Sequence, residues 1–129
     1  MTTDEARTAR MKPILDRIPD HWGKYLPDAG WDDLLLNLDR ALAAFDPDYT
    51  LLQAKEKFGT LRYYTQWSED PTLEDTKVRE LLYDLVTSAE RQSAYICERC
   101  GAVGAKTRSL AWIKTLCDAC FKPKEVVNN

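Results

Sequence analysis

Two Cys-x2-Cys pairs place the strongest constraint on what this chain can fold into. Cys97 and Cys100 form the first pair, Cys117 and Cys120 form the second, and sixteen residues separate the two pairs. Each pair brings two sulfurs to one turn of backbone, and two pairs about 15 to 20 residues apart can close a tetrahedron around Zn²⁺. The spacing predicts a zinc site with all four cysteines as ligands. Such a closed site is structural, because it leaves no open position for a substrate.

Other chemistries are open to the same four cysteines. The pairs could hold an iron centre, act as redox-active dithiols or, in an oxidising compartment, form two disulfides. The first ten residues are polar, and no apolar run approaches the ~18 residues that span a bilayer. We therefore expect a cytoplasmic protein, in which a reducing environment favours thiolate coordination over disulfides.

Two stretches of the chain have apolar residues at the three- and four-residue spacing of an amphipathic helix. Residues 31–45 place Trp31, four leucines and Phe45 on one face, and Asp46-Pro47 ends the stretch. Residues 72–96 show the same spacing from Val78 onward, with Thr72 at the capping position. These stretches predict two main helices.

The segment between the two helices predicts a β-hairpin. Residues 49–67 are rich in aromatic and β-branched types, and Phe58-Gly59 at the turn would give the positive φ to glycine. This register pairs Lys55 with Arg62. It also predicts one buried face, made of Leu52, Ala54, Leu61, Tyr63, Thr65 and Trp67.

Together these elements predict an α+β fold, in which two main helices pack on a β-hairpin and a C-terminal four-cysteine zinc ribbon or knuckle follows. Residues 1–96 would form the body, residues 97–122 the zinc-binding module and residues 123–129 a loose tail. The first thirty residues of the body predict only a poorly defined helix and loop.

Aromatic residues in two of these regions are expected to be covered. Trp22 and Tyr25 lie in the N-terminal loop and should pack on the body, because burying such rings removes a large apolar area from water. In the zinc module a second short hairpin should cover the metal with Trp112, Ile113 and Leu116.

Charge is distributed unevenly along the chain, although the net charge is only -3. Residues 1–90 contain 11 Lys and Arg against 18 Asp and Glu, whereas residues 91–124 contain 7 against 2. The body is therefore acidic and the zinc module is basic. A basic module can meet phosphates, an acidic protein surface or the acidic body of its own chain.

The hairpin and the zinc module together offer a candidate binding face. A basic surface with aromatic residues suits nucleic-acid phosphates and bases or an acidic protein partner, but it also occurs as an ordinary solvated sheet face. The candidate residues are Gln53, Lys55, Arg62 and Tyr64 on the hairpin and Lys106, Arg108 and Lys114 in the module.

Residue sets typical of catalysis are missing from the sequence. His21 is the only histidine, so a histidine-metal nuclease site, a zinc deaminase signature and a Ser-His-Asp arrangement all lack parts. Asp32, Asp33, Asp46 and Asp48 bracket a predicted helix, where capping and solubility explain them. We therefore expect a protein that is not an enzyme.

Three segments, residues 55–64 (KEKFGTLRYY), 96–101 (ICERCG) and 112–120 (WIKTLCDAC), resemble a group of small phage- and prophage-encoded four-cysteine zinc-knuckle proteins. The resemblance covers about residues 31–120 and implies no catalytic residue. It implies a phage or prophage origin. By association, a small protein of this origin is most often a binder that redirects or blocks a host machine.

The leading functional hypothesis is a non-enzymatic, zinc-stabilised interaction protein that binds and modulates a host protein in the host cytoplasm. The alternative is a nucleic-acid-binding accessory or regulatory protein that uses the hairpin face and the basic module. A small-molecule or nucleotide binder built around Trp22, Trp31 and the hairpin is a third hypothesis.

Overall fold

The computed structural model describes residues 2–109 and 112–121, and it confirms the predicted α+β architecture. Along the chain the elements are α1 (Thr3–Arg10), α2 (Lys12–Leu15), η1 (Ala29–Trp31), α3 (Asp32–Ala43), β1 (Thr50–Lys57), β2 (Thr60–Gln66), η2 (Pro71–Glu74), α4 (Thr76–Ser93), β3 (Lys106–Arg108), β4 (Lys114–Leu116) and α5 (Asp118–Phe121). The predicted tail, residues 123–129, lies outside the described residues.

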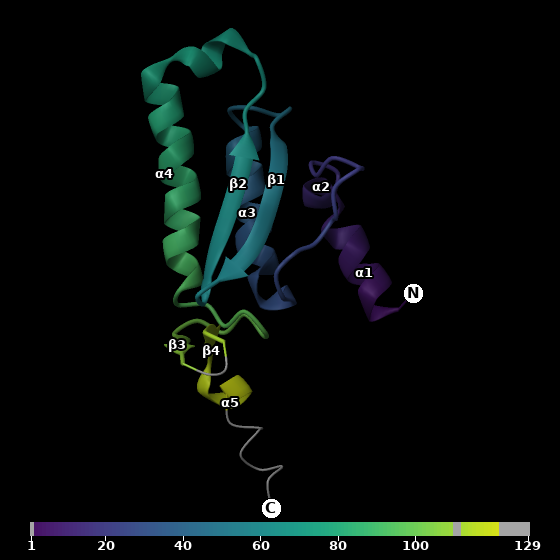
Figure 1. Cartoon of the computed structure of the whole chain (residues 1–129), viewed down its shortest axis with the longest axis vertical. Coiled ribbons are helices and arrows are strands. Elements are labelled where there is room, and N and C mark those ends of the chain that lie inside the picture. The colour runs from purple at the N-terminus through teal and green to yellow at the C-terminus, as the bar shows by residue number, and fades with distance from the viewer. Residues whose placement is uncertain (1, 110–111, 122–129) are drawn as a thin grey trace, which may run out of the picture.

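The body is built around the β1-β2 hairpin. One face of the hairpin covers α3, while α4 runs beside β2 and also contacts α3 (Figure 1). The small β3-β4 hairpin and α5 lie at one end of this body. The buried core includes Met11, Ile14, Ile18, Trp31, Leu35, Leu38, Leu42, Tyr49, Leu51, Ala54, Leu61, Tyr63, Leu73, Leu82 and Ala89.

Both predicted helices form, with shorter bounds than the apolar spacing indicated. Trp31 and the leucines of α3 face the core, but Phe45 follows the end of the helix and is 38% exposed. The long helix begins after Asp75, whose side chain accepts a hydrogen bond from the backbone N–H of Lys77. Asp75, and not Thr72, is therefore the N-cap of α4.

The hairpin has the predicted register and turn. Lys55 pairs with Arg62, and Lys57 pairs with Thr60 next to the two-residue turn. Phe58 has φ 54° and Gly59 has φ 85°, so both central residues have the positive φ that a type I′ turn requires. The Glu56 carboxylate stabilises the turn by accepting a 2.7 Å hydrogen bond from the Gly59 N–H.

A β-bulge corrects part of the predicted buried face. The register shifts between Leu51 and Gln53, so one additional residue of β1 faces the partner strand there. Because each residue added to a strand moves the following side chains to the opposite face, Leu51 is fully buried and Leu52 is only half-buried. Beyond the bulge, Ala54, Leu61 and Tyr63 are buried as predicted.

Two side chains of helix α4 accept hydrogen bonds from backbone N–H groups on the outer edge of β2. The Leu61 N–H donates to Ser93 Oγ at 2.8 Å, and the Tyr63 N–H donates to Glu90 Oε2 at 3.0 Å. An unpaired strand edge is a template for unwanted pairing, and a helix that covers it removes that hazard. These bonds also fix the position of α4 relative to the hairpin.

The N-terminal thirty residues are more ordered than the sequence indicated. A capping box of Thr2 and Glu5 begins α1, and Met11 and Ile14 are fully buried. Trp22 and Tyr25, however, are 41% and 81% exposed, so the expectation that both rings pack on the body is wrong. Apolar area alone did not decide their position, because the core is already filled from α2, α3 and the hairpin.

Three carboxylates of the body are buried and serve as hydrogen-bond acceptors. The Asp32 carboxylate accepts two hydrogen bonds from the Arg7 guanidinium, at 2.8 and 2.9 Å, and one from the Arg10 guanidinium, at 2.7 Å. Asp46 accepts from the backbone N–H and the hydroxyl of Ser68. Asp32 and Asp46 therefore join distant segments, a role beyond the capping and solubility predicted for them.

The third carboxylate, Asp39, belongs to a buried polar network. It accepts hydrogen bonds from Arg17 and from the Tyr49 hydroxyl, which lies 2.7 Å from the hydroxyl of Tyr63. Burial raises the pKa of both phenols, so both stay protonated. The network connects the N-terminal segment to α3 and the hairpin.

Gly30 is the point at which the body meets the first cysteine pair. Its N–H donates a 2.8 Å hydrogen bond to the Glu98 carbonyl, and the neighbouring Trp31 indole N–H donates to the Ile96 carbonyl at 2.9 Å. A Cβ on Gly30 would lie 2.1 Å from the Cys97 carbonyl oxygen and 2.5 Å from the Glu98 carbonyl carbon. Only glycine allows this approach of two backbones.

We expect Gly30→Ala to lower the free energy of unfolding by about 1–3 kcal/mol, because the added methyl group forces two backbones apart. Chemical denaturation of the full chain measures this change. Gly23→Ala is the matched control: the three atoms nearest to its Cβ would belong to the exposed ring of Tyr25, which can move, so a change below about 0.5 kcal/mol is expected. Equal effects of the two substitutions would contradict the packing argument.

Candidate metal centre

The first cysteine pair lies in a tight turn that follows α4. Ile96 forms an isolated antiparallel bridge with Val103, and the Cys97 N–H donates to the Ala102 carbonyl at 2.9 Å. Gly101 has φ 84°, and its N–H donates to the Cys97 carbonyl at 2.8 Å. Glycine at this left-handed position allows the chain to fold back, so the two sulfurs of the pair point into one space.

The second pair lies at the start of α5, after the predicted short hairpin. Leu116 ends β4, and the Cys120 N–H donates a 3.4 Å hydrogen bond to Cys117 Sγ. The backbone of the helical turn closes with a 3.0 Å bond from the Phe121 N–H to the Cys117 carbonyl. The β3-β4 hairpin therefore carries the chain from one pair of sulfurs back to the other.

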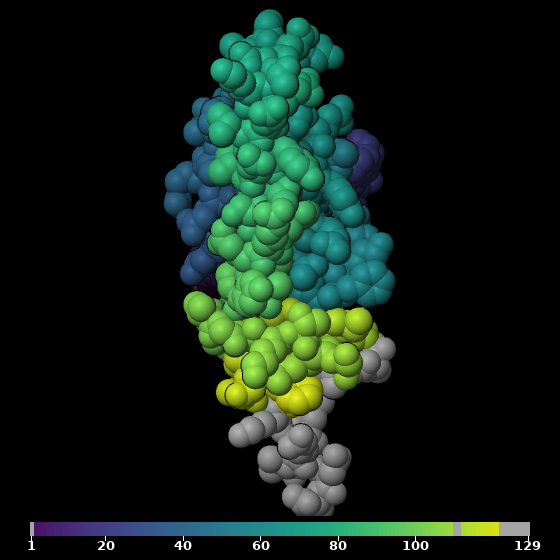
Figure 2. Space-filling model, turned by 90° about the vertical axis from the view of Figure 1, so that its left-hand side faces the viewer, coloured from purple at the N-terminus to yellow at the C-terminus, as the bar shows by residue number. Residues whose placement is uncertain are grey.

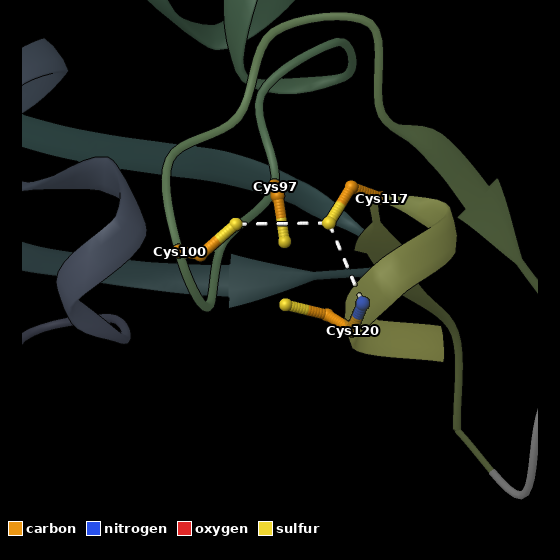
Figure 3. A group of neighbouring side chains, drawn as sticks. All are labelled: Cys97, Cys100, Cys117 and Cys120. Atoms are coloured by element: carbon orange, nitrogen blue, oxygen red, sulfur yellow. Dashed lines mark hydrogen bonds between the residues drawn. The ribbon is translucent and has the colours of Figure 1, made fainter. Parts of the chain in front are cut away.

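The four sulfurs form one cluster, in which they point toward a common centre (Figure 3). All four Sγ atoms lie within 4.8 Å of one another, and those of Cys100 and Cys117 are 3.6 Å apart. A tetrahedral site with metal–sulfur bonds of about 2.3 Å separates its sulfurs by about 3.8 Å. The predicted ligand set is thus brought together at metal-binding distance.

The surroundings of Cys97 and Cys120 shift the pKa values of these two thiols in opposite directions. Although burial opposes ionisation of Cys97, hydrogen bonds from backbone N–H groups, those of Cys100 and Cys117 first, lower its pKa to about 6. Burial and the neighbouring thiols raise the pKa of Cys120 to about 12. Adjacent thiolates repel one another, so a bound divalent cation would be needed to ionise all four.

Glu98, inside the first pair, is a structural residue that the sequence analysis missed. Its side chain is 1% exposed, accepts from the Thr115 N–H at 3.2 Å and has the Lys114 ammonium 3.6 Å away. Burial raises the pKa of this carboxyl group. Glu98 therefore ties the first pair to β4, and only its position between two ligands could have indicated this role.

The predicted cover of the cluster is partly corrected. Leu116 is buried as expected, together with Ala105, and Phe121 packs against them. Trp112, in contrast, is 66% exposed and does not cover the cluster. The guanidinium of Arg108 lies 4.6 Å from the centre of the Phe121 ring, a cation–π contact that the sequence did not indicate.

The candidate binding residues separate into two groups. Gln53, Lys55, Arg62 and Tyr64 share the outer face of the hairpin, and Lys106 is exposed on β3. Arg108 and Lys114 have internal partners instead. Arg108 pairs with Asp118 at 2.6 Å, and Lys114 lies near Glu98 and Asp28.

Comparisons of this chain with protein-family models, curated proteins and solved structures found no match. In the part of the chain that the structure describes, none of the helices has both the length and the apolar composition needed to cross a membrane.

Removal of one ligand should loosen the module and spare the body. In Cys100→Ser we expect the amide protons of Gly30, Gly101 and Thr115 to exchange about tenfold faster or more, while Leu61 and Tyr63 keep the protection that their bonds to α4 provide. Hydrogen–deuterium exchange with residue resolution measures both sets.

Ser109→Ala is the control, because Ser109 is exposed in the same module and offers no metal ligand. Ser109→Ala should leave the exchange rates of the module amides and of the hairpin amides unchanged. Unchanged exchange in Cys100→Ser would mean that the cluster does not hold the module together.

Proposed function

We propose that the four cysteines bind one structural Zn²⁺. Among the common divalent metals, Zn²⁺ is the one that structural sites typically hold with four thiolates in a tetrahedral arrangement. Zn²⁺ also takes no part in redox reactions. Cys97, Cys100, Cys117 and Cys120 would be its ligands. In this role the metal provides folding energy to a segment that buries few apolar side chains of its own.

The protein purified without chelator should therefore contain one equivalent of zinc per chain, measured by elemental analysis. Cys100→Ser should contain less, because three thiolates hold the ion more weakly. Less than about half an equivalent of zinc in the unaltered protein, or iron in its place, would contradict the assignment.

For the whole chain we propose a non-enzymatic protein that acts by binding another protein. The observation that carries this proposal is Phe58, an aromatic residue at the hairpin turn that is 65% exposed although its φ is 54°. A left-handed backbone costs a residue with a side chain about 1–2 kcal/mol, and bulky residues are rare there. Phe58 gives little core packing in return, so contact with a partner explains it better than stability does.

The metal module supports this turn. The Thr115 hydroxyl donates a 2.5 Å hydrogen bond to the Gly59 carbonyl, and a Cβ on Gly59 would lie within 3.3 Å of Thr107 and Ile113. The turn that presents Phe58 is therefore held against β3 and the residues before β4. A rigidly presented aromatic side chain is typical of the residues that dominate protein interfaces.

The resemblance in residues 55–64, 96–101 and 112–120 supports a phage or prophage origin for this function. Two of these segments, which are distant in sequence, meet at the contact between Gly59 and Thr115. On this proposal the partner is a protein of the bacterial host, and the binding modulates that protein in the host cytoplasm.

Nucleic-acid binding is the second candidate. Lys55 and Arg62 lie opposite each other on the outer face, and none of the ion pairs found among the described residues involves either of them. Arg108 and Lys114 weaken this candidate, because their charges are already balanced by Asp118 and Glu98. For a small-molecule binder, Trp31 is unavailable because it is fully buried.

Phe58→Asn separates stability from binding. Asparagine adopts positive φ more readily than phenylalanine, so this variant should be about as stable as the unaltered protein or up to about 1 kcal/mol more stable. It should also fail to retain the protein partner in affinity capture from a lysate of the bacterial host. Denaturation and quantitative mass spectrometry measure the two effects.

The matched control is Tyr25→Asn, which removes a more exposed ring elsewhere on the body and should leave capture unchanged. Lower stability of Phe58→Asn would show that the ring serves the fold. Full retention of the partner by Phe58→Asn would contradict the proposed role in binding.

A further inference from the structure

A shallow groove runs between β2 and the C-terminal half of α4, next to the turn that carries Phe58. Its volume is about 460 Å³. Figure 2 faces α4 directly, with the hairpin beside it. The groove is lined by Thr60 and Arg62 from β2 and by Thr87, Glu90, Arg91 and Tyr95 from α4 and the residues that follow it.

The groove has two arginines whose charges are not balanced by an ion pair within the described part of the chain, and the guanidinium of Arg62 donates a long, 3.4 Å hydrogen bond to the Leu61 carbonyl. No ion pair of the described residues involves Arg62 or Arg91. Glu90 is the one carboxylate of the lining, and its Oε2 atom already accepts from the Tyr63 N–H. With two arginines and one carboxylate in its lining, the groove has a net positive charge. A carboxylate from another molecule would balance it.

Tyr95 adds an exposed aromatic ring, on an anchored backbone, to these charges. Its side chain is 66% exposed, while its backbone carbonyl accepts hydrogen bonds from the N–H groups of Gly104 and Ala105 at 2.8 and 3.0 Å. The backbone that carries the ring is therefore held in place by hydrogen bonds from the metal module. Tyrosine and arginine are enriched at protein interfaces and among the residues that contribute most to binding.

We infer that this groove binds a short acidic segment of the partner protein, with its carboxylates between Arg62 and Arg91 and an apolar side chain against Tyr95. This inference rests on the proposed function, since it specifies the chemistry of the partner. Bidentate hydrogen bonds between guanidinium and carboxylate groups give such a contact both strength and direction.

The charge of the neighbouring surface favours a short acidic segment over a nucleic acid. Farther along α4, Glu80 and Asp84 line the next depression together with a single arginine, Arg79. A polyanion that extended along α4 from Arg91 would meet these carboxylates and be repelled. A protein segment with two or three acidic side chains ends before it reaches them.

The test uses a fluorescein-labelled ten-residue peptide in which three glutamates alternate with leucine and serine, titrated with the full chain at low and at physiological salt. We expect saturable binding that weakens with salt, and about tenfold weaker binding in Arg62→Ala and in Arg91→Ala. Arg40→Ala is the matched control, because Arg40 is exposed on α3 and its guanidinium donates a hydrogen bond to the Asn37 side chain of the same helix. It should change the affinity by less than about twofold.

A counterpart peptide with glutamine in place of glutamate should bind about tenfold more weakly. The inference is overturned if the acidic peptide does not bind, if the glutamine peptide binds equally well, if Arg40→Ala weakens binding as much as Arg62→Ala, or if a ten-nucleotide oligothymidylate binds more tightly than the acidic peptide. The result stands apart from the Phe58 experiment. If Phe58→Asn abolishes capture of the partner and Arg62→Ala does not affect it, the proposed function stands and the groove has no part in it.

Discussion

The hydrogen bond from Gly30 to the carbonyl of Glu98 is the contact on which the rest of the structure depends. It joins the entry to α3 to the turn between the first two cysteines, so the cluster is attached to the body through backbone. Glu98 continues the connection through its side chain, which accepts from the Thr115 N–H of β4. The body and the metal module therefore share backbone contacts that a flexible linker would not provide.

The same arrangement explains how an unfavourable hairpin turn is held in place. A type I′ turn with Asn-Gly would form on its own preference, whereas Phe58-Gly59 needs support from outside the hairpin. Within the hairpin, Glu56 accepts a hydrogen bond from the Gly59 N–H, and from outside it the Thr115 hydroxyl donates one to the Gly59 carbonyl. Strain at one residue is thus balanced by contacts with the module that contains the cysteine cluster.

Local patterns in the sequence predicted much of this fold, and long-range contacts account for what they missed. Cysteine spacing indicated the cluster, apolar spacing indicated α3 and α4, and the glycine at the turn gave the correct register from Gln53 onward. The bulge between Leu51 and Gln53 and the exposed ring of Trp112 were not indicated by these patterns, and the buried acceptors Asp32 and Glu98 bond to residues distant in sequence. Local periodicity carries no information about such partners, so these features could not be predicted from it.

The four-cysteine module has a consequence for the surface of this protein as well as for its stability. The body has a core of its own, drawn from α2, α3, α4 and the hairpin, and does not need the metal for apolar burial. What the module adds is rigidity at two places: Thr115 holds the turn of Phe58, and Gly104 and Ala105 hold the carbonyl of Tyr95. On the proposed function, a backbone already fixed next to these exposed aromatic side chains would reduce the entropy lost on binding. In that case a metal at the cluster would contribute to recognition by ordering the residues around it, without contacting the partner itself.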